Sequence, residues 1–166
     1  ASLAPTSANR VPFTKVILTA GNDGDVTVNS ITVQRTGLGN NAVFAGVVLL
    51  DEDGLQIGVA KTLNSNDQVL AGEAFVVKKG TSRTITIAGN MASSLSSYAG
   101  QVVTLSVVGI NTSATVTGSL PITGAGHTIN ATLSLGSATL TLSSFDPNST
   151  GITKDIGTTG YKFAGV

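Results

Sequence analysis

Residues 11–35, VPFTKVILTAGNDGDVTVNSITVQR, decide the fold. Two runs of alternating apolar and polar residues, 11–20 and 26–35, flank five residues in which Asn, Asp and Gly favour turn conformations. This pattern predicts two β-strands joined by a short connection. Within the second run the alternation changes phase, so we expect a β-bulge near Asn29-Ser30.

The same period of two continues along the rest of the chain. The run 43–50, VFAGVVLL, is apolar throughout and fits a central strand buried on both faces, or an edge strand covered by a partner. Asp51-Glu52-Asp53-Gly54 is a turn that closes a hairpin onto 55–62. The segment 91–98 is the one short helical candidate. Further strands are expected at 73–79, 83–88, 101–110, 113–119, 127–135 and 137–143.

Short strands with a turn about every 8 to 12 residues are typical of a sandwich or barrel. We therefore predict an all-β fold, an immunoglobulin-like antiparallel β-sandwich with a C-terminal extended arm. It would lack the disulfide and the buried Trp of antibody domains, because the chain has neither residue type. The expected organisation is an N-terminal segment at 1–10, the sandwich at 11–143, and a linker with a C-terminal strand or arm at 144–166.

The C-terminal segment joins a linker-like piece to an apolar, alternating run. An apolar strand beyond a finished domain exposes an unpaired hydrogen-bonding edge, and it should pair with a sheet edge. Two interpretations stay open: the segment is the last strand of its own sandwich, or it is an arm that adds a strand to a neighbour. The N-terminal segment 1–13 is a competing donor. The predicted assembly residues are Ile152, Ile156, Tyr161, Phe163 and Val166.

The composition excludes several classes of function. Charged residues make up 11% of the 166 residues, against about 25% in an average domain, and the net charge is zero. Nucleic-acid binding needs clustered Lys and Arg, so no nucleic-acid partner is expected. No apolar run reaches the roughly 18 residues of a transmembrane segment. With no Cys and one His, the chain is not expected to be an enzyme or to hold a cofactor.

Two acidic turns are candidates for calcium. Calcium takes six to eight oxygen ligands, and short loops rich in carboxylates supply them. The alternative is that Asp and Gly stand there for backbone reasons, as in ordinary turns. The candidate ligands are Asp23, Asp25, Asp51 and Asp53.

Single residues suggest three further kinds of site. Asn111, Asn130 and Asn148 begin N-x-S/T sequences and are glycosylation candidates, although about three such sequences are expected by chance. His127 lacks the partners of a catalytic or metal site and is expected to be a loop histidine. Lys15 could form an isopeptide cross-link if it were buried beside Asn and an acid, but alternation favours an outward-facing lysine.

Five segments between residues 11 and 130 carry a shared pattern: Thr19–Val28, Ile31–Gly37, Val48–Gly54, Val76–Ile87 and Thr117–Gly124. Together they resemble the tandem immunoglobulin-like repeats of large bacterial surface and S-layer-type proteins. In such arrays a Pro-containing linker and the first strand of the next repeat follow each repeat, and residues 144–166 fit that place. The present chain corresponds to one repeat, which leaves open whether it polymerises or was cut from a longer array.

These observations predict a structural protein of the cell surface or extracellular space. It would self-assemble into a filament, array or S-layer-like coat by strand addition between neighbouring subunits. Its partners would be copies of itself or adjacent repeats, because a surface with few charges tends to associate. The alternative is an adhesion or carbohydrate-binding module, although such modules usually use exposed aromatic side chains.

Overall fold

The computed structural model describes residues 2–133, 135–136 and 138–141. The chain divides into two compact units, Ala1–Leu135 and Gly136–Val166. The fold described below is that of the first unit. In the second unit, the described residues lie in no helix or strand.

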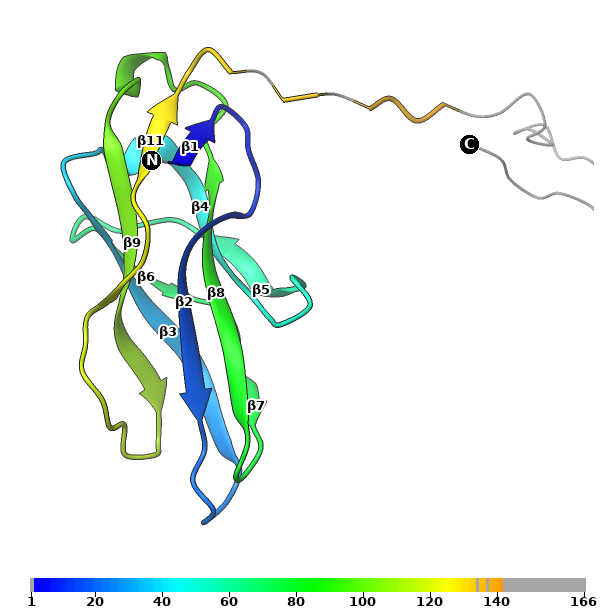
Figure 1. The fold of residues 1–166 in the computed structure, drawn as a ribbon, viewed down its shortest axis with the longest axis vertical. Coiled ribbons are helices and arrows are strands. Elements are labelled where there is room, and N and C mark those ends of the chain that lie inside the picture. The colour runs from blue at the N-terminus through cyan, green and yellow to red at the C-terminus, as the bar shows by residue number, and fades with distance from the viewer. Residues whose placement is uncertain (1, 134, 137, 142–166) are drawn as a thin grey trace, which may run out of the picture. The chain divides into compact units, whose positions relative to one another are not determined.

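The first unit consists of strands and two short 3-10 turns (Figure 1). The turns are η1 (Asn41–Val43) and η2 (Ser96–Tyr98). No helix in the described part of the chain is therefore long or apolar enough to cross a membrane. The strands are β1 (Ser2–Pro5), β2 (Val11–Thr19), β3 (Val26–Thr36), β4 (Phe44–Leu50), β5 (Gln56–Lys61), β6 (Gln68–Ala71), β7 (Phe75–Val77), β8 (Ser82–Met91), β9 (Val102–Thr112), β10 (Ile122–Thr123) and β11 (His127–Asn130).

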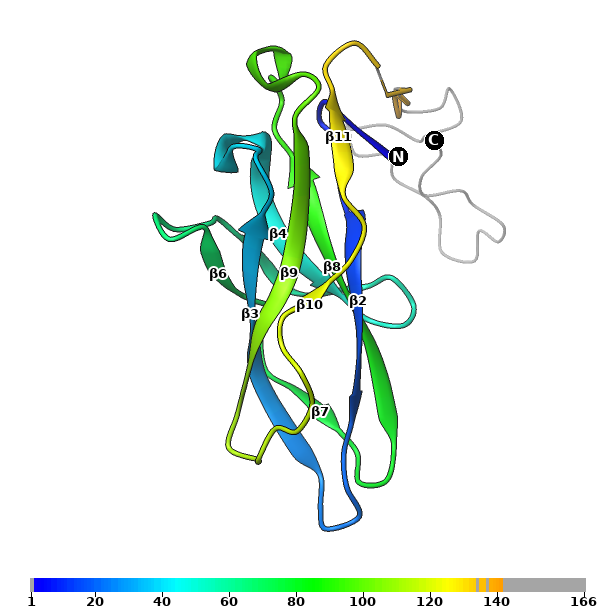
Figure 2. The same ribbon diagram turned by 60° about the vertical axis from the view of Figure 1, so that its left-hand side comes forward.

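The strands form two sheets that lie face to face (Figures 1 and 2). The four-stranded sheet has the order β2-β8-β4-β5. The seven-stranded sheet has the order β1-β11-β9-β3-β6, with β10 paired to β9 and β7 paired to β3. All pairs are antiparallel except β1 with β11, which run parallel.

The strand order differs from that of an immunoglobulin sandwich at the first two long strands. In an immunoglobulin sandwich, strands A and B share one sheet. Here the first two long strands, β2 and β3, lie in opposite sheets. The all-β sandwich is thus confirmed, whereas the immunoglobulin-like order is not shown.

The core lies between the two sheets and is made of the inward-facing apolar residues. Ile31 and Leu105 come from the seven-stranded sheet, and Leu49, Ile85 and Ile87 come from the four-stranded sheet; all five are completely buried. Their period of two is the one seen in the sequence, because alternate side chains of a strand point to the same face.

Several strand predictions are confirmed. The register between β3 and β9 shifts between Val28 and Ser30, which is the expected bulge. In β4 the five residues 46–50 are all buried, as expected for a strand covered on both faces.

Other predictions are wrong. The helical candidate 91–98 forms only the turn η2. Residues 113–119 form no strand, the strand expected at 127–135 ends at Asn130, and the described residues 138–141 of the strand expected at 137–143 are not extended in a sheet. The N-terminal segment 1–10, expected to lie outside the sandwich, instead contributes β1 to it.

Candidate functional site

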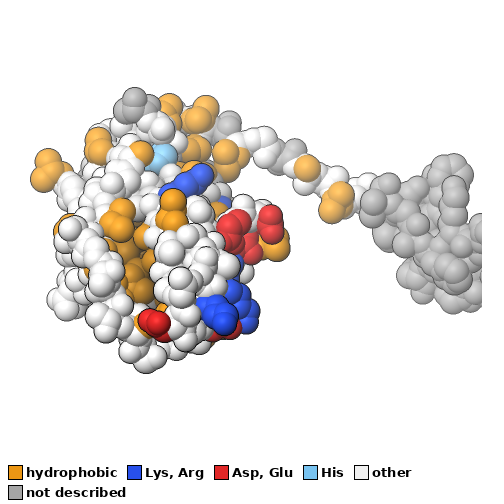
Figure 3. Space-filling view, turned by 60° about the horizontal axis from the view of Figure 1, so that its bottom comes forward, with side chains coloured by type: hydrophobic (Ala, Val, Ile, Leu, Met, Phe, Trp, Pro, Cys, Tyr) orange, Lys and Arg blue, Asp and Glu red, His pale blue; other side chains and the backbone are white. Residues whose placement is uncertain are grey.

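An open groove lies along one edge of the sandwich, in its lower half as drawn in Figures 1 and 2. It has a volume of ≈ 700 Å³. One wall is the second half of β2 and the turn that follows it, and the other is the end of β9 with residues 114–117. Seen from this end of the molecule, apolar side chains lie between ridges of polar side chains and backbone (Figure 3).

The upper half of the same edge is closed. Residues 123–127 cross from the seven-stranded sheet to β2 and fix its first residues by hydrogen bonds. The hydroxyl of Thr14 also donates to the carbonyl of Leu105 in β9. The crossing bonds are Ala125 N–H to Phe13 O (3.0 Å), Gly124 N–H to Thr14 Oγ1 (2.9 Å) and His127 Nε2–H to Pro12 O (2.9 Å).

Below this crossing, β2 is an edge strand with one free side. It pairs with β8 throughout, and no other described strand pairs with it from Lys15 to Thr19. Its N–H and C=O groups on the outer side are therefore available to an incoming strand.

The opposite wall also ends in an unpaired edge. On the side of β9 that faces away from β3, β11 pairs at residues 102–103 and β10 at residues 106–107. No described strand pairs with that side between Val108 and Thr112, although residues 114–117 fold back along the groove there. Among the described strands, neither edge strand has a partner across the gap between the two sheets, which leaves the gap open in this part of the structure.

The floor of the groove is apolar and its rim is acidic. Val28 and Val77 form part of the floor and are 2% exposed, and Ile110 lies beside them. Asp23 and Asp25 lie at the rim, and the lining residues include no aromatic side chain, Lys or Arg. This composition suits an apolar stretch of extended chain better than a charged small molecule.

Two of the four acidic residues expected to bind calcium, Asp25 and Asp51, have other partners. Asp25 accepts a hydrogen bond from Lys78 Nζ at 2.7 Å and from the Lys79 amide at 2.9 Å, which holds the pKa of this carboxyl below its usual value. Asp51 accepts from the amides of Asp53 and Leu55, as in an ordinary turn. The described residues include no group of three or more His, Cys, Asp or Glu that could hold a metal ion. Calcium at these turns stays a prediction.

The glycosylation candidates lie in different settings. Asn111 is half-buried on β9, and its amide donates to Ser30 Oγ at 2.9 Å and Thr32 Oγ1 at 3.1 Å. A glycan on that nitrogen would compete with both bonds. The Oδ1 of Asn130 accepts from the amide of Thr132 in a local turn. Asn148 lies outside the described residues, as do all five predicted assembly residues of the tail.

His127 is not a loop histidine, and that expectation is wrong. It begins β11, is 6% exposed and packs edge-on against Phe13 with ring centroids 4.4 Å apart. Its Nδ1 has no partner among the described residues. The sequence did indicate a strand position, since His127 begins an alternating run. Its hydrogen bond to Pro12 could not be predicted, because it forms only where residues 123–127 cross to β2. Lys15 is exposed, as alternation predicts.

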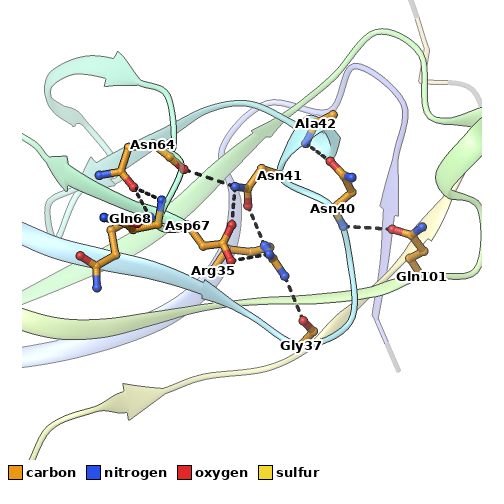
Figure 4. Close-up of polar contacts among 10 residues, drawn as sticks. Arg35, Gly37, Asn40, Asn41, Ala42, Asn64, Asp67, Gln68 and Gln101 are labelled. Carbon is orange, nitrogen blue, oxygen red and sulfur yellow. Dashed lines mark hydrogen bonds and ion pairs between the residues drawn. The ribbon is translucent and has the colours of Figure 1, made fainter.

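A polar cluster that the sequence analysis missed lies at a different part of the sandwich (Figure 4). Arg35, 12% exposed, forms an ion pair with Asp67 at 2.7 Å and donates to Asn41 Oδ1 at 2.6 Å and Gly37 O at 2.9 Å. Asn41 in turn donates to Asp67 at 2.6 Å. The cluster fixes the loops around β3 and β6, because each of the three guanidinium nitrogens of Arg35 meets a partner.

We expect acid to weaken the fold through Glu52. Arg83 donates two hydrogen bonds to this carboxylate and lowers its pKa from 4.5 to about 2. A depressed pKa stabilises the folded state above pH 4.5, and that stabilisation is lost as the pH falls from 4.5 to 2. Both side chains are partly exposed, so the effect should be modest and screened by salt.

Urea unfolding at a series of pH values measures this effect. Glu52→Gln should flatten the loss of stability between pH 4.5 and 2, and Glu73→Gln, at an exposed glutamate without an ion pair in the described residues, should not. Equal pH profiles for the parent and Glu52→Gln would contradict the assignment.

Comparison of the chain with protein-family models, with curated protein sequences and with solved structures found no match. The class of protein is described by its fold and its groove. It is an all-β sandwich with one half of one edge open.

Proposed function

We propose that the protein is a structural component of a cell surface or extracellular assembly. Copies of the chain, or adjacent repeats, join into a filament, array or S-layer-like coat. Each copy gives a strand to its neighbour, and no chemical step is involved. The resemblance to bacterial surface repeats suggests this role, and the low charge of the chain favours association.

The open groove is the observation that carries the proposal. Unpaired strand edges with an apolar floor between them are what a sandwich lacking one strand presents. Strand addition satisfies the free N–H and C=O groups and covers the floor at the same time. The groove has no aromatic lining, so the carbohydrate-binding alternative gains no support from it.

The C-terminal segment is the proposed donor, because the competing N-terminal segment is already engaged. Ser2–Pro5 pairs with β11 in the same chain, and Ala4 is completely buried. The amide of Ser7 donates to Ala92 O at 3.0 Å, which anchors the connection to β2. An N-terminal donor would have to give up these contacts.

Electron microscopy and sedimentation of two chains test the proposal. The full chain should form filaments or sheets, and a chain ending at Thr150 should remain a folded monomer. If both chains stay monomeric and the shorter one is less stable, the tail belongs to its own sandwich and the proposal fails.

A further inference from the structure

We infer that β2 is the receiving strand: residues 152–166 of a second copy add to the four-stranded sheet alongside Lys15–Thr19 and cover the groove. This inference rests on the proposed function and specifies its interface. The incoming segment becomes a fifth strand in the order tail-β2-β8-β4-β5.

The other edges are less suited to receive a strand. β1 already closes one end of the seven-stranded sheet, and β6 and β7 close the other. Of these three strands only β7 reaches the groove, through Val77 in its floor. β7 is a three-residue strand that pairs with β3, as β9 does, so its own edge is not the edge beside the groove. β5 is the second edge strand of the four-stranded sheet, and none of its residues lines the groove. At β9 the free edge is flanked by residues 114–117. Among the described strands, only β2 combines the adjacent groove with an edge, from Lys15 to Thr19, along which no other described segment pairs or folds back.

The length and pattern of the tail match this edge. The open part of β2 has five residues and is about 17 Å long at roughly 3.3 Å per residue. The tail offers the alternation Tyr161, Phe163, Gly165 over the same length. Placed beside β2, one face of this strand would direct both aromatic rings onto the floor formed by Val28 and Val77, which has no aromatic side chain of its own.

Charge does not oppose this occupant. The rim carries Asp23 and Asp25, and no Lys or Arg lines the groove. Residues 151–166 carry Lys154 and Lys162 against a single acidic residue, Asp155. Because Asp25 is paired with Lys78 at this rim, charge contributes little to the approach of the tail.

A tail strand beside β2 would bring particular side chains of the two copies together. If Tyr161 and Phe163 face the groove, Lys162 lies on the opposite face of the new strand. That is the outer face of the sheet, where Lys15, Ile17 and Thr19 are exposed. Side chains of adjacent strands on one face lie close enough for a disulfide, and the chain has no cysteine to interfere.

Disulfide trapping in the full chain is the test. Lys162→Cys is combined in turn with Lys15→Cys, Ile17→Cys and Thr19→Cys, because the register along β2 is not fixed in advance. After mild oxidation, at least one of the three pairs should give a ladder of covalent multimers on a denaturing, non-reducing gel. The matched control pairs Lys162→Cys with Val59→Cys on β5, where the valine is 61% exposed against 67% for Ile17. It should give no ladder.

A second pair of variants tests the same edge without cysteine. β2 already carries one lysine, Lys15, at the end of its open part. A second lysine at the centre would lie on the same face as Lys162 of the incoming strand, and like charges on neighbouring strands oppose pairing. Ile17→Lys should therefore abolish filaments at concentrations at which the parent assembles. Val59→Lys should leave them unchanged. Both sites are exposed, so both variants should unfold at the parent's urea midpoint, which shows that any loss comes from assembly.

The outcomes separate the inference from the proposed function. A ladder from Val59→Cys alone, or filaments that persist in Ile17→Lys, would overturn β2 as the receiving strand while the strand-addition function stands. A disulfide within one chain would instead give a monomer that migrates faster than the reduced chain on the gel. If the β2 pairs give this product, the tail occupies the groove of its own chain, which also overturns the inference. A full chain that forms no filaments at all would instead remove the proposed function.

Discussion

Replacing Gly124 with alanine is expected to lower the free energy of unfolding by about 2 to 4 kcal/mol. A Cβ at this position would overlap the carbonyl oxygen of Phe13 and lie 2.7 Å from Thr14 Cα. The crossing segment would have to move away from β2. It would lose the Gly124 bond to Thr14 and the Ala125 bond to Phe13, which close the upper half of the edge.

Two measurements check this expectation. Urea unfolding gives the change in stability, and hydrogen exchange should show that the Ala125 amide loses protection in the variant. Gly24→Ala is the matched control: nothing lies within 4 Å of a Cβ there, so the change should stay within about 0.5 kcal/mol. An unchanged unfolding midpoint for Gly124→Ala would show that the crossing segment does not hold the edge closed.

The second large effect is expected in the core. Ile85 on β8 is completely buried between the sheets, and Ile85→Ala should cost about 2 to 5 kcal/mol, from lost burial and from the cavity that remains. Ile17, one strand away on β2, is 67% exposed. The same substitution there should change the stability by less than about 1 kcal/mol, within the range of strand propensity.

Urea unfolding of both alanine variants measures the difference. The slope of the unfolding free energy with urea should match that of the parent, because the same surface is exposed on unfolding. Equal losses at the two sites would mean that the sheets do not enclose Ile85 as described.

The long strands could be predicted from the sequence because burial on one face repeats every two residues. This signal identified β2, β3, β4, β8 and β9, and it identified the bulge in β3 because the phase of alternation changes there. The strands β1, β6 and β10 have two to four residues. A strand of two to four residues is too short for an alternating pattern to be recognised in the sequence. Whether such a segment forms a strand depends on the partner strand that it meets.

At 113–119 the sequence predicts a strand that does not form. Its composition suits a strand, but it pairs with no described strand and only lines the groove. Residues in a strand need a partner as well as a pattern. The groove itself could not be predicted for the same reason, because it exists where two sheet edges lack partners. Pairing across the sandwich is a property of the whole fold, set by the point at which residues 123–127 cross to β2.

The parallel pairing of β1 with β11 has a mechanical consequence. Ser2 lies opposite His127, and Pro5 lies opposite Asn130. Tension that enters before Ser2 and leaves after Asn130 pulls the two strands past one another along their length. The four residue pairs then carry the load together, whereas a hairpin pulled at its open end separates one pair at a time. A chain pulled by these two points, before Ser2 and after Asn130, would therefore be loaded in shear at the β1–β11 pair.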